Sequence, residues 1–356
     1  MSNDTLERPT EVVDVPTLPR PRRAIPVLMI LAVLPVVALL ASFTMGRYAI
    51  SLPDLFQVFF GHLLGWPQTW PRATEMVVFN VRLPRIGIAL LVGAALATSG
   101  TAYQGIFKNP MVSPDILGAA AGAGFGAAMA ILMDFNTVGI ELSAFVGGLV
   151  AVSITYALGN SIGRGSNAVL VLVLTGMVVQ AMFSAFISIT KFVADPNNKL
   201  PEITFWLMGG LSAVSNNEFF VLIAPFLLGV IPIFLLRWKL NVLSFGEEEA
   251  QALGVNTRTI RLIFIICATL LTSSSIAVAG MIGWVGLIIP HLARLLVGPD
   301  ARVLLPASLL IGAGYLVIVD DIARTAFPTE VPLGILTAII GAPFFMFLLV
   351  KGRDAW

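Results

Sequence analysis

The chain has 356 residues, of which 57% are hydrophobic and 12% are charged, and its mean hydropathy is +0.93. Soluble domains carry about 25% charged residues, so we expect most of this surface to face lipid. The net charge of +1 gives no basic footprint for nucleic acid. The single cysteine, Cys267, lies in an apolar stretch and excludes an internal disulfide framework.

The N-terminal segment, residues 1–24, is rich in proline and arginine and shows no periodic apolar face. We predict that it is a disordered cytoplasmic tail. A cleaved signal peptide is the alternative, but the apolar run that follows is about 20 residues long, which is longer than a signal core and sufficient to cross a bilayer. The rest of the chain, 25–356, is predicted to be one polytopic membrane domain.

The sequence contains apolar runs at 25–45, 85–107, 116–133, 137–160, 167–190, 217–236, 259–280, 281–297, 302–319 and 333–350. The seventh and eighth runs are continuous in hydropathy, but together they exceed the length of one membrane span. Gly280, Gly283 and Gly286 offer a reversal between them. The chain therefore has ten spans if this run forms two helices, and nine if it forms one.

The distribution of basic residues favours ten spans. With a cytoplasmic N-terminus, the cytoplasmic segments then hold 14 of the 21 Lys and Arg residues, which is the asymmetry of the positive-inside rule. Nine spans would place Lys351 and Arg353 outside. We therefore predict that both termini are cytoplasmic.

The seventh and eighth runs also carry broken helical backbone at glycines and at Pro290. Lipid tolerates such breaks only where neighbouring protein or water satisfies the freed backbone groups, so this segment is predicted to lie inside the bundle. An inverted internal repeat, as in many transporters, is indicated by a shared spacing of Gly100, Pro110 and Gly118 with Gly280, Pro290 and Gly298.

A short helix is predicted in the loop 240–257. Glu247, Glu248 and Glu249 follow Gly246, where acidic side chains favour a helix N-terminus. Gly254 is placed to end the helix in a left-handed cap. A helix of about seven residues is too short to be stable alone, so it docks either on its own bundle, as an ordinary connecting loop, or on a partner.

Charged residues also gather at the predicted outer side, against the positive-inside trend, at Arg82, Arg85, Asp320, Asp321, Arg324 and Glu330. Solvated interface charge and partner docking are both open interpretations. Phe205 and Trp206, after the fifth span, are typical of an interfacial aromatic belt, with contact to a flat ligand as the alternative.

Several residue patterns required for enzymes are missing from the sequence. It has no Gly-x-x-x-x-Gly-Lys-Ser/Thr phosphate loop, so we expect no ATP hydrolysis by this chain. The only histidines, His62 and His291, are far apart and accompany no cysteine cluster. We therefore predict no enzyme activity, no metal site and no cofactor on this chain.

The chain resembles the FecCD-type permeases, the membrane subunits of binding-protein-dependent ABC importers for iron-siderophores, haem and cobalamin. The resemblance covers about 30–352 and rests on motifs at 277–294, 82–85, 109–118, 243–254, 330–334 and 341–344. It implies an all-α membrane protein with about ten transmembrane helices, arranged as in cobalamin-importer permeases with an inverted internal repeat. One departure is Met111, where relatives commonly have leucine.

The resemblance implies three functional regions. The coupling helix, which inserts into a cleft of an ATPase, would include Leu243, Gly246, Glu247, Glu248, Ala250, Leu253 and Gly254. Glutamates of a substrate-binding protein would meet Arg82, Arg85 and Arg324, and the cytoplasmic gate would be Asn109, Pro110 and Met111. The implied assembly, in the cell inner membrane, is a homodimer with two ATPase subunits, which bind ATP and Mg, and an extracytoplasmic binding protein.

The substrate remains open at this stage. A ferric siderophore is favoured because it is the commonest substrate class among such permeases, with haem, cobalamin and molybdate or tungstate as alternatives. An ion-coupled secondary transporter would place charged residues at mid-membrane, where the helix centres here are almost free of charge. For an intramembrane enzyme no catalytic residues can be named.

Overall fold

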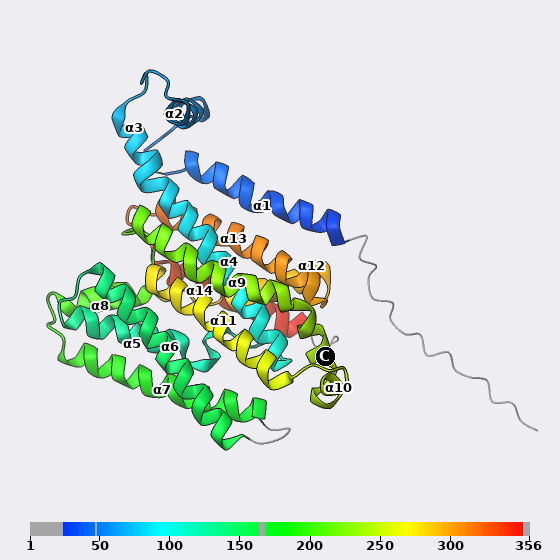
Figure 1. Ribbon diagram of the computed structural model, residues 1–356. Coiled ribbons are helices and arrows are strands. Elements are labelled where there is room, and N and C mark those ends of the chain that lie inside the picture. The colour runs from blue at the N-terminus through cyan, green and yellow to red at the C-terminus, as the bar shows by residue number, and fades with distance from the viewer. Residues whose placement is uncertain (1–23, 47, 164–167, 352–356) are drawn as a thin grey trace, which may run out of the picture.

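The structure is a computed structural model that describes residues 24–46, 48–163 and 168–351, so the predicted tail lies outside the described residues apart from its last position. Within these ranges every regular element is a helix (Figure 1). The helices are α1 (Ala24–Thr44), α2 (Leu52–Leu64), α3 (Arg72–Met76), the π-helix η2 (Val77–Arg82), α4 (Leu83–Phe107), the 3₁₀-helix η3 (Pro114–Leu117), α5 (Ala119–Leu132), α6 (Thr137–Ile162), α7 (Ala168–Val193), α8 (Lys199–Met208), α9 (Asn216–Phe245), α10 (Glu247–Ala252), α11 (Thr257–Ala279), α12 (Val285–Val297), α13 (Ala301–Thr325) and α14 (Leu333–Lys351).

The predicted spans correspond to apolar helices in the structure. Seven described helices are long and apolar enough to cross a membrane, and the apolar helices α5, α12 and α14 are shorter. Each of the ten predicted runs contains one of these helices, and the continuous seventh and eighth runs separate into α11 and α12. The ten-helix prediction is confirmed at the level of helix number and composition.

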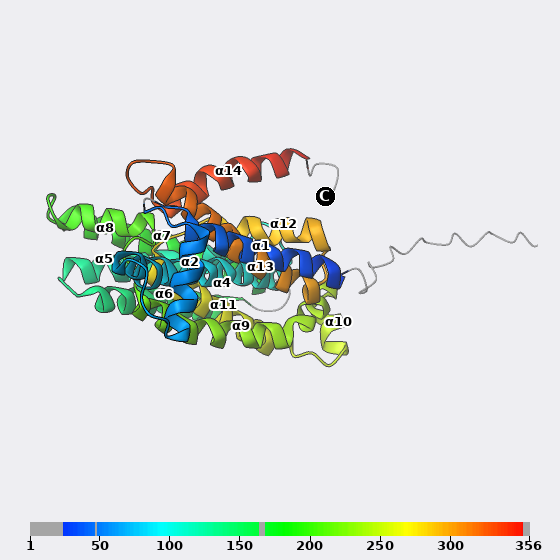
Figure 2. The ribbon, with the colours of Figure 1, turned by 90° about the horizontal axis from the view of Figure 1, so that it is seen from above.

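Helix α4 occupies the middle of the bundle, between α13, α11, α9 and α12 (Figures 1 and 2). Its small residues allow this, because neighbouring backbones approach closely there. A Cβ atom at Gly93 would lie 2.2 Å from the carbonyl oxygen of Gly312, and one at Gly100 would lie 1.8 Å from that of Gly286. The rest of α4 is buried along nearly its whole length.

The glycine and proline spacing used to indicate a repeat does not mark equivalent positions. Gly100 lies inside α4, whereas Gly280 ends α11; Pro110 lies in a loop, whereas Pro290 lies inside α12. These glycines are instead explained by the local contacts and turns of each segment.

Pro84 lies in the first turn of α4, which begins at Leu83. Helical backbone runs without interruption from Arg72 to Phe107, with the π-helix η2 just before Pro84. Proline lacks a backbone N–H and is tolerated where the regular ladder is already shifted. The amide of Leu83 accordingly donates to the carbonyl of Val78, five residues earlier.

The broken segment between α11 and α12 lies inside the bundle, as predicted. The chain leaves α11 at Gly280, with φ of 67°, and enters α12 after Trp284, with φ of 68°. A neighbouring loop satisfies one of the freed backbone groups, because the Gly210 amide donates to the Ala279 carbonyl at 2.8 Å. The same loop accepts a hydrogen bond at Gly209 from the Leu333 amide, at 2.9 Å.

The bundle has two ends with different elements. We call the end that carries α2, α3 and α8 the α2 end, and the opposite end, where α10 lies, the α10 end (Figures 1 and 2). Among the described helices, α2, α8 and α10 are too short or too polar to count as spans.

Candidate functional site

The short helix predicted in the loop after the sixth run is present as α10, at 247–252. Helix α9 continues to Phe245, farther than its apolar run, and Gly246 makes the turn into α10 with φ of 138°. Gly254 ends the turn after α10 with φ of 79°, which confirms the left-handed cap. Glu247 also forms an ion pair with Arg261 at the start of α11.

One expectation about this helix is wrong. Ala250 was assigned to its partner-facing surface, but it is fully buried against the α9 and α11 end of its own bundle, with Leu243 and Val255 in the same core cluster. A six-residue helix needs this anchor to stay folded. Leu253, which the sequence analysis placed in the coupling helix, is 65% exposed. Phe245, which was not in that set, is 70% exposed.

The α10 helix is connected to the core through the last turns of α9. Leu240 packs against Gly105 of α4, because a Cβ added at Gly105 would lie 3.2 Å from a Leu240 methyl group. Asn241 donates to the Asp300 carboxylate at 2.7 Å and accepts from the Ala301 amide at 2.8 Å. The last turns of α9, which lead into α10, therefore contact both α4 and the start of α13.

The predicted gate residues form the loop that follows α4 at this same end. Asn109 accepts a hydrogen bond from the Met111 amide at 2.9 Å, and the Met111 side chain is 41% exposed. The turn into this loop is made by Lys108, with φ of 50°. The three predicted gate residues thus lie together, on the surface of the described chain.

A buried glutamine that the sequence argument did not assign holds this loop. Gln104 is 2% exposed and donates to the carbonyls of Val112, at 3.4 Å, and Leu287, at 3.3 Å. Its own carbonyl oxygen accepts from Arg294 of α12 at 3.0 Å. Gln104 therefore joins the gate loop to α12.

A groove of about 610 Å³ runs along the face formed by α5, α7 and α14. Its wall is mostly aliphatic, with Met208, Met281 and Ile339 among the lining residues. Its polar contributions come chiefly from Asp115, Gln180 and Ser184. A large, weakly polar solute fits such a wall better than a small anion does, since Asp115 is the one acidic or basic lining residue.

The three predicted docking arginines meet at the α2 end, but they are not exposed. Arg82, Arg85 and Arg324 are 3%, 8% and 8% exposed. Arg85 donates Nε to Asp320 at 2.9 Å and donates Nη1 and Nη2 to Glu330, each at 3.1 Å. The expectation of an exposed basic cluster is wrong, because carboxylates of the same chain neutralise it.

The remaining two arginines fasten α1 to the bundle. Arg82 donates to the backbone carbonyls of Phe43 and Tyr48. Arg324 pairs with Asp321 and donates to the Ser42 carbonyl at 2.8 Å, while the Ser42 hydroxyl donates to Asp321 at 2.7 Å. This network, in which Asp320 and Asp321 are 1% and 4% exposed, holds α1, α4 and α13 together.

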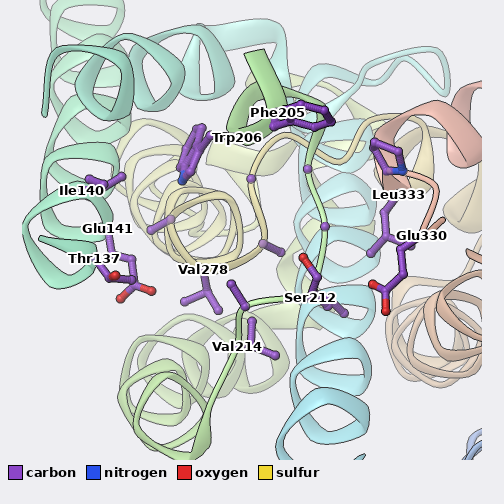
Figure 3. A pocket seen from close by; sticks show the side chains of 18 of the residues that line it. Thr137, Ile140, Glu141, Phe205, Trp206, Ser212, Val214, Val278, Glu330 and Leu333 are labelled. Carbon is purple, nitrogen blue, oxygen red and sulfur yellow. The ribbon is translucent and has the colours of Figure 1, made fainter. Parts of the chain in front are cut away.

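A cavity of about 420 Å³ opens beside this network (Figure 3). Glu141 and Glu330 lie on opposite sides of it, and Phe205 and Trp206 of α8 line its rim. Phe205 is 68% exposed, whereas Trp206 packs on the core. Lys199, in the first turn of α8, donates a hydrogen bond to Asp134, and this bond raises the pKa of the Lys199 ammonium group.

Comparison with known proteins gives a consistent picture. Residues 33–351 match the FecCD transport family. The molybdate import system permease protein MolB of Haemophilus influenzae is 40% identical over 329 residues, 90% of this chain and 94% of its own length. The Fe(3+)-citrate import system permease protein YfmE of Bacillus subtilis is 39% identical, over 94% of this chain and 97% of its own length. The hemin transport system permease protein HmuU of Yersinia pestis is 34% identical, over 91% of this chain and 95% of its own length.

Solved structures include a close neighbour. A metal-chelate type ABC transporter in an inward-facing conformation superposes with a TM-score of 0.82 and 39% identity, covering 92% of this chain and 99% of its own. PsaBC of Streptococcus pneumoniae, in complex with Fab, has a TM-score of 0.54 and 17% identity, with 82% of this chain covered and 94% of its own. The second likeness concerns the fold alone.

Proposed function

Because the chain belongs to the FecCD transport family, we propose that it forms the translocation pathway of an ABC importer, driven by ATP hydrolysis on a partner subunit. The chain is a transport permease and not an enzyme. The observation that carries the proposal is α10, a short helix with exposed Phe245 and Leu253 that is joined through Leu240 and Asn241 to the gate-bearing helix α4 and to α13.

In this proposal the coupling surface consists of exposed residues at the α10 end, namely Phe245, Glu248 and Leu253. Leu243, Gly246, Glu247, Ala250 and Gly254 shape and anchor it. Two ATPase subunits, which bind ATP and Mg, engage α10 from two copies of this chain. Closure of the ATPases moves α10 and the end of α9. The loop with Asn109, Pro110 and Met111 then opens or closes the pathway at the axis between the two copies.

The α2 end is proposed to receive an extracytoplasmic binding protein. Arg82 and Arg324 are enclosed by backbone and by Asp321. In the Arg85–Glu330 pair, by contrast, the Glu330 side chain is 37% exposed, so a partner's carboxylate can reach this pair and replace Glu330. A carboxylate of the binding protein would take the place of Glu330 on Arg85. Binding of the partner would then stay strong only at low salt, as exposed charge pairs are screened.

The docking proposal predicts the direction in which the affinity for the binding protein should change. The variant Glu330→Gln removes the competing charge and is expected to tighten binding of the partner protein in a surface-plasmon measurement at low salt. The control Glu202→Gln changes another carboxylate of the outer cavity that no ion pair joins to Arg85. Unchanged affinity for Glu330→Gln would show that Arg85 is a structural residue only.

We propose a metal chelate, and specifically a ferric siderophore, as the substrate class. The supporting observation is the groove of about 610 Å³ with a largely aliphatic wall and the carboxylate of Asp115. Haem, cobalamin and molybdate are the alternatives, and the similarity to MolB favours molybdate among them. An oxyanion site would require convergent N–H donors or arginines, whereas this groove presents a carboxylate, which repels anions.

Uptake by the reconstituted importer tests the substrate proposal. Proteoliposomes containing the complete complex are supplied with ferric siderophores, haem, cobalamin or molybdate, each with the cognate binding protein. ATP-dependent accumulation of a ferric chelate, and no accumulation of molybdate, is the expected result. Accumulation of molybdate alone would overturn it.

The proposed location is the cell inner membrane, with both termini and α10 on the cytoplasmic side. A reporter fused after Trp356 is expected to be active only in a form that works in the cytoplasm. Activity of an export-dependent reporter at this position would overturn the proposed topology.

A further inference from the structure

A groove at the α2 end, separate from the cavities described above, lies between the α2–α3 segment, η2 and the start of α9. Its volume is about 550 Å³. Its wall changes from polar to apolar along the helix that begins at Arg72. Gln68 and Arg72 are polar and exposed, and the next lining residues inward are Met76, Phe79 and Leu83, with Phe220 contributed by α9.

Helix α2 lies across the bundle at this end. Figure 1 shows it end-on and Figure 2 shows it lengthwise, so its axis is nearly perpendicular to the long helices. Ser51 caps its start and Gly65, with φ of 67°, ends it. Gly61 packs on Trp70, because a Cβ added there would lie 2.2 Å from the indole ring. The orientation of α2 is therefore fixed by the fold.

The opposite face of α2 is an exposed apolar stripe. Its side chains, 38–70% exposed, are Leu52, Phe56, Phe59, Phe60, Leu63 and Leu64. A short amphipathic helix that lies across the spans with such a stripe is typical of the membrane interface. The stripe is continuous with apolar residues of the neighbouring span, since Phe59 stacks on Phe79 at 5.8 Å and Met76 is 61% exposed.

The groove is also at the depth of lipid head groups. The continuous helix Arg72–Phe107 has 36 residues, about 54 Å at 1.5 Å per residue, whereas the hydrocarbon core is about 30 Å thick. The helix is therefore longer than the hydrocarbon core, and the exposed Arg72 at its start favours placing this end among the head groups. The π-helix η2 lies at the groove itself, and such irregular turns are frequent at functional sites.

We propose that this groove binds one phospholipid of the leaflet at the α2 end. The phosphate lies at Arg72, whose guanidinium matches a phosphate group, and Asn80, an exposed lining residue, reaches the ester region. An acyl chain lies along Met76, Leu83 and Phe220. The oxygens of Glu75, which also lines the groove, are engaged by His62, Gln68 and Trp70, at 2.8, 3.2 and 3.1 Å, so the phosphate contacts Arg72 and not this carboxylate.

The test measures lipid bound to the purified full chain. The protein is stripped of lipid in detergent, titrated with phosphatidylglycerol, and analysed by native mass spectrometry. The variants are Arg72→Gln for the head group and Phe220→Ser for the acyl chain. The matched controls are Arg302→Gln, an exposed arginine at the other end, and Val221→Ser, a lipid-exposed residue next to Phe220 that does not line the groove.

The expected result is one tightly retained lipid per wild-type chain and per control chain. Loss of Arg72 should weaken its retention about fivefold, the factor that corresponds to one basic side chain at an anionic lipid surface, and Phe220→Ser should weaken it as well. Glycerophosphate, which has no acyl chains, should not displace the lipid. Equal retention by all variants, or displacement by glycerophosphate, would each overturn the proposal.

Discussion

At the α2 end, charged side chains are buried and paired within the chain. At the α10 end, a short helix exposes apolar side chains and is held by only a few contacts. Arg85 is held by two carboxylates and Arg324 fastens α1 to α13. In contrast, α10 is fixed mainly by Ala250 and by the Glu247–Arg261 pair. The first end is fixed by many internal polar contacts, whereas the second has few such contacts and is the end at which we propose that a partner binds.

The largest expected effect comes from breaking the buried network. Arg85→Ala leaves Asp320, 1% exposed, without its main partner. Removing one member of a buried ion pair costs about 3–5 kcal/mol, so we expect a clear loss of thermal stability of the full chain in detergent. Arg302→Ala, at an exposed site, is the control.

A second change shows whether this loss is electrostatic. In the double variant Arg85→Ala/Asp320→Ala, the buried charge is removed together with its partner, and part of the stability should return. A double variant as unstable as the sum of both single variants would mean that the two residues do not act as a pair.

An intermediate effect is expected at the link between the gate loop and α12. Gln104→Leu removes the acceptor for Arg294 and the donor for the Val112 and Leu287 carbonyls. Leaving buried polar groups unsatisfied costs about 1–3 kcal/mol. Hydrogen exchange of residues 108–113 should become faster, while exchange in α2 should not change. Unaltered exchange in the loop would contradict this role of Gln104.

The smallest effect is expected at the cap of the coupling helix. Gly254→Val forces a β-branched residue to adopt φ of 79°, although a Cβ there meets no atom within 4 Å. The cost is therefore backbone strain alone, roughly 1–2 kcal/mol. Gly210→Ala at the other end is the control, because its Cβ also meets no atom and its φ is not left-handed. Equal stability of the two variants would contradict the cap.

Hydropathy predicted the number of helices because membrane spans are defined by length and composition, which the sequence contains directly. The turn at Gly246 and the cap at Gly254 were also predictable, since few residues tolerate such backbone angles. Burial of Ala250 was not predictable, because an alanine on a short helix suits its own bundle as well as a partner.

Burial of the docking arginines was missed for a related reason. The sequence places Arg85 and Asp320 more than 200 positions apart, so their pairing becomes visible only when α4 and α13 lie side by side. The same holds for the link between Gln104 and Arg294. Long-range polar contacts leave no periodic signal in a single sequence.

The account rests most directly on the claim that an ATPase subunit binds the exposed apolar side chains of the α10 end. The measurement is the amount of ATPase that co-purifies with the full chain, for wild type, Phe245→Ser, Leu253→Glu and the conservative control Leu253→Met. Leu253 is 65% exposed, so none of its substitutions should unfold the chain. The account predicts that Leu253→Met retains the ATPase and that Leu253→Glu and Phe245→Ser lose it. Full retention of the ATPase by both disruptive variants, with normal ATP-driven uptake, would contradict it.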